Sequence, residues 1–366
     1  CLQRLSRYSR LLRGNKFFGK RKTKEKEIKK MNLEELMLRA IANAESFKYT
    51  AKPNPVVGAI LFKDNEIISE GYHEVYGSKH AEINSISNAK KFLGKRFNNF
   101  SELTLICTLE PCSHIGKTGS CAHEIVRTGV KKVVIGSIDP NPKVSGKGIE
   151  ILKKNNIDVV VGIHEDIVKN QNKYFFFKHT NNKPYIILKI ASSLDGKSHI
   201  NGDERTIITS EASRDDAQIL RASCDAILTG GNTLINDNPR MNARVNFPTN
   251  QPKKILLTSK DYDLKLNFFK DNNFQIFKNK DLIKIIESLK DQDICSILIE
   301  AGPKLANSFL RLGLVDEIIT YTSNNKLGDI AVSWFEENNA IENYGFKLES
   351  SYKIENDIKK VFKKNG

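Results

Sequence analysis

Long apolar runs are missing from this sequence of 366 residues. None approaches the roughly 18–20 residues that a membrane-spanning helix needs, and no apolar segment typical of a signal peptide stands near the start. Cysteine is also scarce and too scattered for a disulfide scaffold. We therefore expect a cytoplasmic protein whose cysteines are thiols or metal ligands, namely Cys1, Cys107, Cys112, Cys121, Cys224 and Cys295.

Positive charge is abundant but unevenly placed. The net charge is +15, and residues 1–30 hold twelve Lys and Arg against Glu25 and Glu27, which leaves only +5 for the rest of the chain. The excess therefore belongs to a basic leader and not to a folded face. This leader fits a solvated or nucleic-acid-binding tail, an organelle transit peptide, or an extension upstream of a true start at Met31.

A helix is predicted directly after the leader. In "MNLEELMLRAIANAES", Asn32 can cap the helix with Glu35 at the third helical position. Leu33, Leu36, Met37 and Ile41 then form one apolar stripe. Hydrophobic residues make up 39% of the chain and charged residues 28%, as in a globular protein of this length with two domains.

Helices and strands are predicted to alternate in two series. In the first, 56–62 and 67–71 form a hairpin, a helix begins near His80, another follows Cys121, and further elements cover 103–109, 131–138, 148–156 and 158–162. In the second, strands cover 185–192, 225–230, 253–259, 294–300 and 317–323, with helices at about 210–223, 281–290 and 303–312. We expect largely parallel sheets covered by helices. The stretch 170–184 is the predicted linker, so the domains are 1–30 (leader), 31–175 and 176–366.

Two short motifs indicate a metal site. "HAE" places His80 and Glu82 two residues apart, and "PCSHIGKTGSC" places Cys112 and Cys121 nine apart. A catalytic zinc ion needs three protein ligands and one open position for water, and one His with two Cys supplies them. Glu82 is then the base beside the metal-bound water, as in the zinc nucleobase deaminase signature. A structural zinc site would need a fourth ligand that these motifs do not supply.

The motifs also predict local structure. We expect Pro111 and Cys112 at the start of a helix, whose free backbone N–H groups would stabilise a Cys112 thiolate. Eight residues separate the two cysteines, whereas the general signature has two. This longer loop holds His114 and Lys117, which are both suited to a phosphate group.

Longer segments resemble the bifunctional deaminase–reductases of riboflavin biosynthesis, over about residues 31–366. The matching segments are "KPNPVVGAI" (52–60), "GYHEVYGSKHAE" (71–82), "TLEPCSHIGKTGSC" (108–121), "DPNPKVSGKG" (139–148), "SLDGK" (193–197), "ILTGGNTLINDNPRMNAR" (227–244) and "IEAGPKLANSFLRLGLVDE" (299–317). The spacing of the two cysteines is more specific to this family than "HAE" is.

The resemblance implies both a fold and two activities. It implies an N-terminal cytidine-deaminase-like three-layer α/β/α domain and a C-terminal dihydrofolate-reductase-like α/β domain. The first would hydrolytically deaminate a diaminopyrimidinone that carries a phosphoribosylamino group, with one Zn²⁺ per chain. The second would reduce the ribosyl group to ribityl with NADPH. The implied partner is this small-molecule substrate, with no nucleic acid or membrane, and a homo-oligomer is left open.

The resemblance assigns residues to both reactions. It places His80, Cys112 and Cys121 on zinc, with Glu82 as proton shuttle. Pyrimidine or ribose-phosphate contacts in the first half would be Asn54, His73, His114, Lys117, Asp139 and Asn141. Substrate contacts in the second half would be Arg205, Arg221, Arg244 and Glu300, with Lys189 and Glu300 polarising or protonating the opened ribose. Cofactor contacts would be Ala191, Ile207, Thr233, Asp237, Gly302, Pro303, Lys304, Leu305, Ala306, Asn307 and Ser308.

The second half contains no GxGxxG motif after a strand, so a Rossmann fingerprint is absent. Phosphates could instead lie on the strand–turn–helix segments "ILTGGNTLIND" and "ILIEAGPKLANSFL", where helix N-termini offer free N–H groups. The residues alone leave two other functions open. One is a deaminase whose second half only binds ligands, and the other is a nucleic-acid-binding zinc protein that uses its basic leader.

Overall fold

The protein is described by a computed structural model that covers residues 32–94, 100–113, 119–200, 206–279, 281–335 and 340–364. The chain divides into two compact units, residues 1–176 and 177–366. Among the described residues, no helix combines the length and the apolar composition needed to cross a bilayer.

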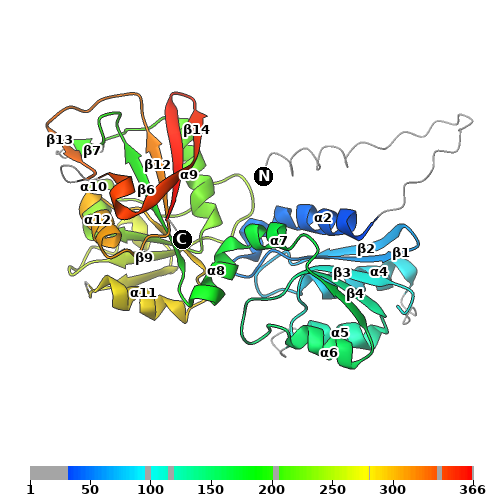
Figure 1. Ribbon diagram of the computed structural model, residues 1–366. Coiled ribbons are helices and arrows are strands. Elements are labelled where there is room, and N and C mark those ends of the chain that lie inside the picture. Colours follow the sequence, from blue (N-terminus) through cyan, green and yellow to red (C-terminus); the bar gives the residue numbers. More distant parts are fainter. Residues whose placement is uncertain are drawn as a thin grey trace, which may run out of the picture. The chain divides into compact units, whose positions relative to one another are not determined.

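The first unit is built on a five-stranded sheet with the order β2-β1-β3-β4-β5 (Figure 1). Strand β1 pairs antiparallel with β2 and β3, while β3, β4 and β5 run parallel. The predicted hairpin and the three later strands are confirmed, with slightly different ends. The strands are β1 (Gly58–Lys63), β2 (Glu66–Tyr72), β3 (Thr104–Leu109), β4 (Lys132–Ser137) and β5 (Asp158–Val161).

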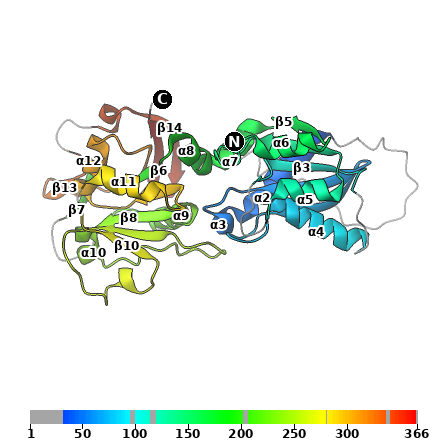
Figure 2. The same cartoon turned by 90° about the horizontal axis from the view of Figure 1, so that it is seen from below.

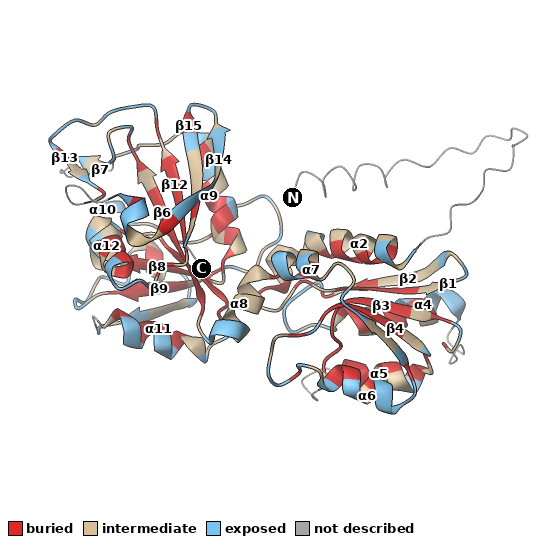
Figure 3. Cartoon of the chain, in the orientation of Figure 1, coloured by how far each residue is buried: buried red, intermediate tan, exposed pale blue. Residues whose placement is uncertain are grey.

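Alternate residues along these strands are buried on opposite faces of the sheet. Ala59 and Leu61 of β1 pack with α4, α5 and α6, whereas Ile60 between them packs with α2 and α7. The central strands β3 and β4 repeat this pattern, so the unit has three layers (Figure 3). The helices are α2 (Leu33–Ala44), α3 (Lys48–Ala51), α4 (Ala81–Leu93), α5 (Cys121–Thr128), α6 (Lys147–Lys154) and α7 (Glu165–Gln171), with a 3₁₀ turn at η1 (Glu45–Phe47).

Helix α2 begins as its sequence predicts. The Asn32 side chain accepts a hydrogen bond from the Glu35 backbone N–H at 2.8 Å and caps the helix. Leu36, Met37 and Ile41 are fully buried on the sheet. The basic residues before this helix lie outside the described residues.

The segment predicted as a linker contains the division between the units, and it is helical. Most of it lies in α7 and in α8 (Lys173–Asn181), and the division between the units falls inside α8. Aromatic side chains explain why the segment is ordered. Phe175 and Phe176 pack against the apolar cluster of the first unit. Phe177 meets the Tyr185 ring edge-on, with the ring centroids 4.9 Å apart.

The second unit contains an eight-stranded sheet with the order β10-β9-β8-β11-β6-β12-β15-β14, and a separate pair β13-β7. From β10 to β12 the neighbouring strands are parallel, and β15 and β14 then add an antiparallel hairpin. The five predicted strands are confirmed as β6 (Tyr185–Ser192), β8 (Ala226–Gly230), β9 (Lys253–Leu257), β11 (Ser296–Ile299) and β12 (Glu317–Thr322). Five further strands were not predicted from the sequence, namely β7 (Lys197–Ile200), β10 (Phe274–Phe277), β13 (Ala331–Ser333), β14 (Phe346–Ile354) and β15 (Asp357–Lys364).

Apolar side chains of α11 and α12 cover one face of this sheet. They pack on alternate residues of the parallel strands, such as Ile186 and Leu188 of β6. Figure 2 shows α11 and α12 on the same side of this sheet. Because the strands are parallel, their carboxyl ends meet at one edge, where ligands bind in folds of this class. The helices are α9 (Glu211–Ser223), α10 (Gly231–Asp237), α11 (Leu282–Lys290) and α12 (Pro303–Arg311), with 3₁₀ turns at η2 (Asn267–Phe269) and η3 (Ile341–Tyr344).

Candidate active sites

His80 stands at the N-terminus of α4, as its motif predicts. It is the N-cap residue, with extended backbone, and the helix starts at Ala81. The helix start is packed directly onto β2, because a Cβ atom added at Gly71 would lie 2.1 Å from the Ser85 nitrogen and 2.3 Å from the Ala81 oxygen. Only glycine allows this backbone approach, and the approach fixes where His80 lies.

Backbone hydrogen bonds hold the two cysteine segments together. The Ala122 N–H and the Ser120 hydroxyl both donate to the Cys112 carbonyl oxygen, at 3.1 and 3.0 Å. The Cys121 N–H points at the Cys112 sulfur, with 3.4 Å between N and Sγ. The two sulfurs are therefore placed by the start of α5, which Ser120 caps through the His123 N–H.

The predicted helix start at Pro111 and Cys112 is wrong. Residues 111–113 are not helical, and the helix begins at Cys121. The eight residues between Cys112 and Cys121 separate the Cys112 sulfur from the start of α5. The predicted interaction nevertheless exists in another form, because an N–H group at the start of α5 reaches the Cys112 sulfur from across the loop.

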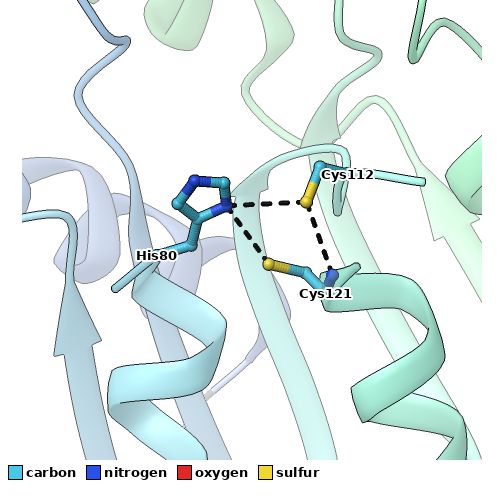
Figure 4. Close-up of side chains that lie close together, drawn as sticks. All are labelled: His80, Cys112 and Cys121. Carbon is cyan, nitrogen blue, oxygen red and sulfur yellow. Dashed lines mark hydrogen bonds between the residues drawn. The ribbon is translucent and has the colours of Figure 1, made fainter. Parts of the chain in front are cut away.

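The three side chains converge as the motifs predict (Figure 4). The His80 Nδ1 atom lies 3.2 Å from Cys121 Sγ and 3.5 Å from Cys112 Sγ. All three ligand atoms lie within 4.8 Å of one another, and both cysteines are buried. One imidazole and two sulfurs are donors that zinc accepts, and three protein ligands leave a position for water, so the residues fit a catalytic zinc ion.

The hydrogen bonds within this cluster shift the pKa values of its three ligand side chains. The Cys121 thiol and then the His80 ring hydrogen-bond to the Cys112 sulfur and lower the pKa of Cys112 to about 4, although burial alone would raise it. The hydrogen bond between the two cysteines raises the pKa of Cys121 well above its ordinary value. Contact with Cys112 raises the pKa of His80 to about 9. Cys112 is therefore the more acidic thiol of the pair, and both cysteines would be thiolates as ligands of zinc.

Glu82 lies beside the cluster in the first turn of α4. Its side chain is 3% exposed, and burial raises the pKa of its carboxyl to about 7, against the opposing charge of His80. Interaction with the Cys121 side chain opposes this rise in pKa. A buried carboxyl at this position is suited to receive and return a proton next to the ligands.

His73 and Asn54, both predicted substrate contacts, lie next to the metal cluster. The His73 ring is edge-on to the His80 ring, with the centroids 5.5 Å apart. Its Nδ1 faces the Lys79 carbonyl oxygen at 3.2 Å, so Nδ1 carries the proton and Nε2 accepts from the Asn54 amide at 3.1 Å. Burial lowers the pKa of His73, which keeps the ring neutral.

Asp139 and Asn141 follow the carboxyl end of β4. Asp139 is 7% exposed and accepts the Asn141 N–H at 2.8 Å. Burial raises the pKa of Asp139 to about 7, and the charges of Glu110, Cys112 and Glu82 add to the effect of burial. This electrostatic coupling to Cys112 and Glu82 indicates that the loop borders the cluster. The other two predicted contacts of this half, His114 and Lys117, lie outside the described residues.

Glu110 is a buried residue that the sequence analysis did not single out. It precedes "PC" by one position and is 3% exposed. Its carboxylate accepts four backbone N–H groups from the segment 139–149. A charged residue at the end of an otherwise apolar strand is the signal that could have identified it.

In the second unit, Arg221 and Glu300 form a buried ion pair. The guanidinium donates from Nε to Oε1 at 2.6 Å and from Nη2 to Oε2 at 2.7 Å. Its Nη1 donates to the Asn242 carbonyl oxygen at 3.2 Å. Burial alone would raise the pKa of Glu300, but Arg221, then Lys189 and Arg244, lower it to about 2.

Lys189 lies next to this pair in the sheet. Glu300 follows β11, in which Ile299 is in register with Leu188 of β6, so Lys189 and Glu300 come next on neighbouring parallel strands. The Lys189 ammonium also lies 6.0 Å from the centre of the Tyr321 ring. Lys189, Glu300 and Arg221 are thus brought together by β6, the end of β11 and α9.

A cavity of about 260 Å³ opens beside Arg221. Arg244, a predicted substrate contact, lines it and donates to the Asn242 side chain at 3.4 Å. Asp237, predicted to face the cofactor, lines the same cavity. Arg205 lies outside the described residues. The cavity is lined by Arg221, Asp237, Asn238, Pro239, Arg240 and Arg244.

The predicted cofactor turn at the start of α12 has its expected form. Gly302 is the N-cap residue without a side-chain cap and Pro303 occupies the first turn, so N–H groups of Lys304 and Leu305 are available. Ala306 and Asn307 are buried, and the Asn307 amide donates to the backbone instead of facing outward. The Ser308 hydroxyl bonds to Lys304 O at 2.9 Å.

Of the remaining predicted cofactor contacts, Ala191 and Thr233 lie near the carboxyl ends of β6 and β8. Ala191 is near the end of β6, where its carbonyl oxygen accepts the Trp334 N–H at 2.6 Å. Ile207 is 70% exposed, and Thr233 is part of α10, which follows β8. Among the described residues, the buried Thr229 hydroxyl at the end of β8 has no hydrogen-bond partner. Free donors at a parallel-sheet edge fit a nucleotide cofactor.

Two family models match the chain. The cytidine and deoxycytidylate deaminase zinc-binding region matches residues 30–137. The RibD C-terminal domain matches residues 184–360. The metal cluster lies in the first matched segment, and Lys189, Arg221 and Glu300 lie in the second.

Whole-length relatives carry both segments in the same order. The riboflavin biosynthesis protein RibD of Buchnera aphidicola subsp. Baizongia pistaciae is 35% identical over 376 residues, which cover 90% of this chain and 98% of that protein. The chain belongs to the RibD family. The RibD of Aquifex aeolicus is 34% identical, and the match covers 84% of this chain and 95% of that protein.

Solved structures agree with this membership. The chain is similar to RibD of Acinetobacter baumannii with a TM-score of 0.83 and 33% identity, over 91% of this chain and 99% of that one. A deaminase/reductase from Thermotoga maritima gives a TM-score of 0.78 with 29% identity and the same coverage. The protein is thus a bifunctional riboflavin-biosynthesis enzyme, with a zinc-binding deaminase unit and a reductase unit that uses a nicotinamide cofactor.

Proposed function

We propose that the first unit deaminates 2,5-diamino-6-(5-phosphoribosylamino)pyrimidin-4(3H)-one and that the second unit reduces the ribosyl group of the product to ribityl with NADPH. The convergence of His80, Cys112 and Cys121 beside the buried Glu82 carries the first half of this proposal. The Thermotoga maritima relative, whose described activities are the same two steps, supports the pairing of the reactions.

In the deaminase unit, His80, Cys112 and Cys121 would hold the zinc ion. Zinc, when bound, supplies a Lewis acid that makes water nucleophilic near neutral pH. Glu82 takes a proton from the attacking water and delivers protons to the pyrimidine ring nitrogen and to the departing amino group. The carbon–nitrogen bond is hydrolysed, ammonia leaves, and a carbonyl group remains on the ring.

Around this centre, His73, Asn54, Asp139 and Asn141 would orient the pyrimidine. The neutral His73 ring is held by Asn54 and by the Lys79 carbonyl oxygen, so it lines the site without adding charge. Asp139 and Asn141 present a carboxyl and an amide from one loop, which suit the amino and carbonyl groups of an aminopyrimidine. We keep His114 and Lys117 as the proposed phosphate contacts.

In the reductase unit, NADPH when bound supplies the hydride to ribose C1′. Glu300 stays ionised at neutral pH because its pKa is about 2, so we assign the proton donor role to Lys189. The Lys189 ammonium would give its proton to the ribose ring oxygen as the ring opens. Glu300 and Arg221 would orient the ribose, and Arg244 with Arg205 would hold its phosphate.

The test uses the purified zinc-loaded protein and the aminopyrimidine substrate. We expect ammonia release first and NADPH oxidation second, with the second step dependent on the first. Ammonia release without NADPH oxidation or NADPH binding would leave a deaminase with a non-catalytic second unit. Absence of both reactions would overturn the proposal.

A further inference from the structure

One carboxylate joins the metal-ligand segment to the predicted pyrimidine loop. Glu110 Oε2 accepts the backbone N–H groups of Asp139 at 3.2 Å and Gly146 at 3.0 Å. Its other oxygen, Oε1, accepts those of Gly148 at 2.9 Å and Ile149 at 3.3 Å. All four bonds are made by a side chain that is 3% exposed.

The backbone on both sides of these bonds is closely packed. Glu110 donates its own N–H to the Ser137 carbonyl oxygen at 2.9 Å, which continues the pairing of β3 with β4. A Cβ atom added at Gly148 would lie 2.0 Å from the Pro111 carbonyl oxygen. The start of α6 is therefore seated directly on the residue that precedes Cys112.

Helix capping alone does not explain this arrangement. Gly146 is the N-cap residue of α6 and has no side chain, so Glu110 does replace a cap there. However, the N–H group of Asp139 lies seven residues before Gly146 and is not part of that helix. A serine or aspartate at the N-cap position would satisfy α6 but would leave Asp139 unattached.

We propose that Glu110 is a positioning residue for deamination. Its carboxylate sets the place of the Asp139–Asn141 loop relative to the Pro111–Cys112 segment, so that the pyrimidine contacts and a metal ligand are held by one group. The proposal rests on the proposed role of Asp139 and Asn141 as substrate contacts. A carboxylate is needed because both oxygens accept two N–H groups, whereas a glutamine amide would present N–H donors to two of them.

The test compares Glu110→Gln with a matched control, Glu150→Gln. The control removes an exposed carboxylate from α6, the helix whose first N–H groups Glu110 binds. For the Glu110 variant we expect kcat/KM of deamination to fall by about tenfold or more, mainly through KM. Zinc content and the reduction of the deaminated intermediate should stay at the parent level. Hydrogen exchange should become faster in residues 139–149 and stay unchanged in β1. The control should match the parent in all four measurements.

A double-mutant cycle with Asn141→Ala distinguishes positioning from a general structural effect. If Glu110 acts through the loop, the two changes in kcat/KM are not additive, because the second substitution removes a contact that the first has already displaced. Additive effects, unchanged kinetics, or loss of zinc together with activity would each overturn the proposal. If Glu110→Gln does not fold, Glu110→Asp is measured in the same way, since the shorter side chain reaches fewer of the four N–H groups.

Ammonia release and hydrogen exchange distinguish a failure of this inference from a failure of the proposed function. A parent enzyme that releases no ammonia would refute the assigned deamination, and the exchange measurement would still decide whether Glu110 orders the loop. Unchanged exchange in residues 139–149 of the Glu110 variant would contradict the inference whatever the parent catalyses.

Discussion

Replacing Glu82 with Ala removes one carboxyl group and leaves the three ligand side chains in place. We expect deamination to fall by about 10²–10⁴-fold, the contribution typical of a general acid–base group. Zinc content should not change, and reduction of the deaminated intermediate should continue at the parent rate. Ammonia release and metal analysis on the same sample check this, with exposed Glu102→Ala as the control. A variant that loses zinc would show that Glu82 supports the metal instead.

The ion pair of Arg221 and Glu300 makes stability depend on pH in a defined direction. The pKa of Glu300 is about 2 in the folded protein and 4.5 for an ordinary glutamate. Between these values the unfolded chain binds more protons than the folded one. The stabilisation is therefore fully present above about pH 4.5 and is lost as the pH falls toward 2. A difference of this size corresponds to about 3 kcal/mol.

Urea unfolding of the parent and of Glu300→Gln tests this expectation. The gap between their free energies of unfolding should be constant near neutral pH and should narrow below about pH 4.5. Glu349→Gln, which breaks the exposed pair with Lys363, should give a small gap at every pH. A gap for Glu300→Gln that does not narrow down to about pH 3 would contradict the assigned pair.

At the scale of elements, the contact between β2 and α4 determines the place of a metal ligand. A Gly71→Ala substitution puts a methyl group about 2 Å from the backbone of α4, so the helix start must move. A shift near 1 Å in catalytic geometry can cost about 10²-fold in rate. We expect a loss of that order in deamination, weaker zinc binding and unchanged reductase activity. Lys91→Ala, on the exposed side of α4, is the control, and equal losses in both activities would contradict the prediction.

Most elements could be predicted from the sequence because their apolar residues recur with a clear period. The strands β3, β4 and β6 each contain three or more consecutive apolar residues, and β12 is buried along most of its length, as expected of strands buried on both faces. The cap of α2 at Asn32 and the Gly302–Pro303 start of α12 have local signals that tertiary contacts do not override. The hairpin β14–β15 was missed because exposed, lysine-rich residues hide its alternation.

The errors near the site have a different cause, which is contact between segments distant in sequence. Nothing within "EPC" shows that the next helix begins only at Cys121, since that depends on the intervening loop. The role of Glu110 depends on N–H groups up to 39 residues away. The pairing of Arg221 with Glu300 likewise joins residues 79 apart. The ligand types could be predicted, but the partners of each side chain could not.

At the scale of the whole molecule, the two chemistries use separate residues. The predicted zinc ligands all lie in the first unit, and Lys189, Arg221 and Glu300 all lie in the second. Removing zinc with a chelator should therefore stop ammonia release and leave reduction of the deaminated intermediate unchanged. Adding zinc back should restore deamination. Loss of both activities on chelation would show that the second unit depends on the metal.

Helix α8 limits how the enzyme could be shortened to one activity. Three consecutive phenylalanines span the division. Phe175 and Phe176 pack in the apolar cluster of one unit, while Phe177 packs edge-on against Tyr185 of the other. The two pieces of α8 left by a cut at this point would be too short to stay helical by themselves, so the rings would loosen and favour aggregation. A monofunctional descendant of either half would have to retain the whole helix or replace these rings with polar residues.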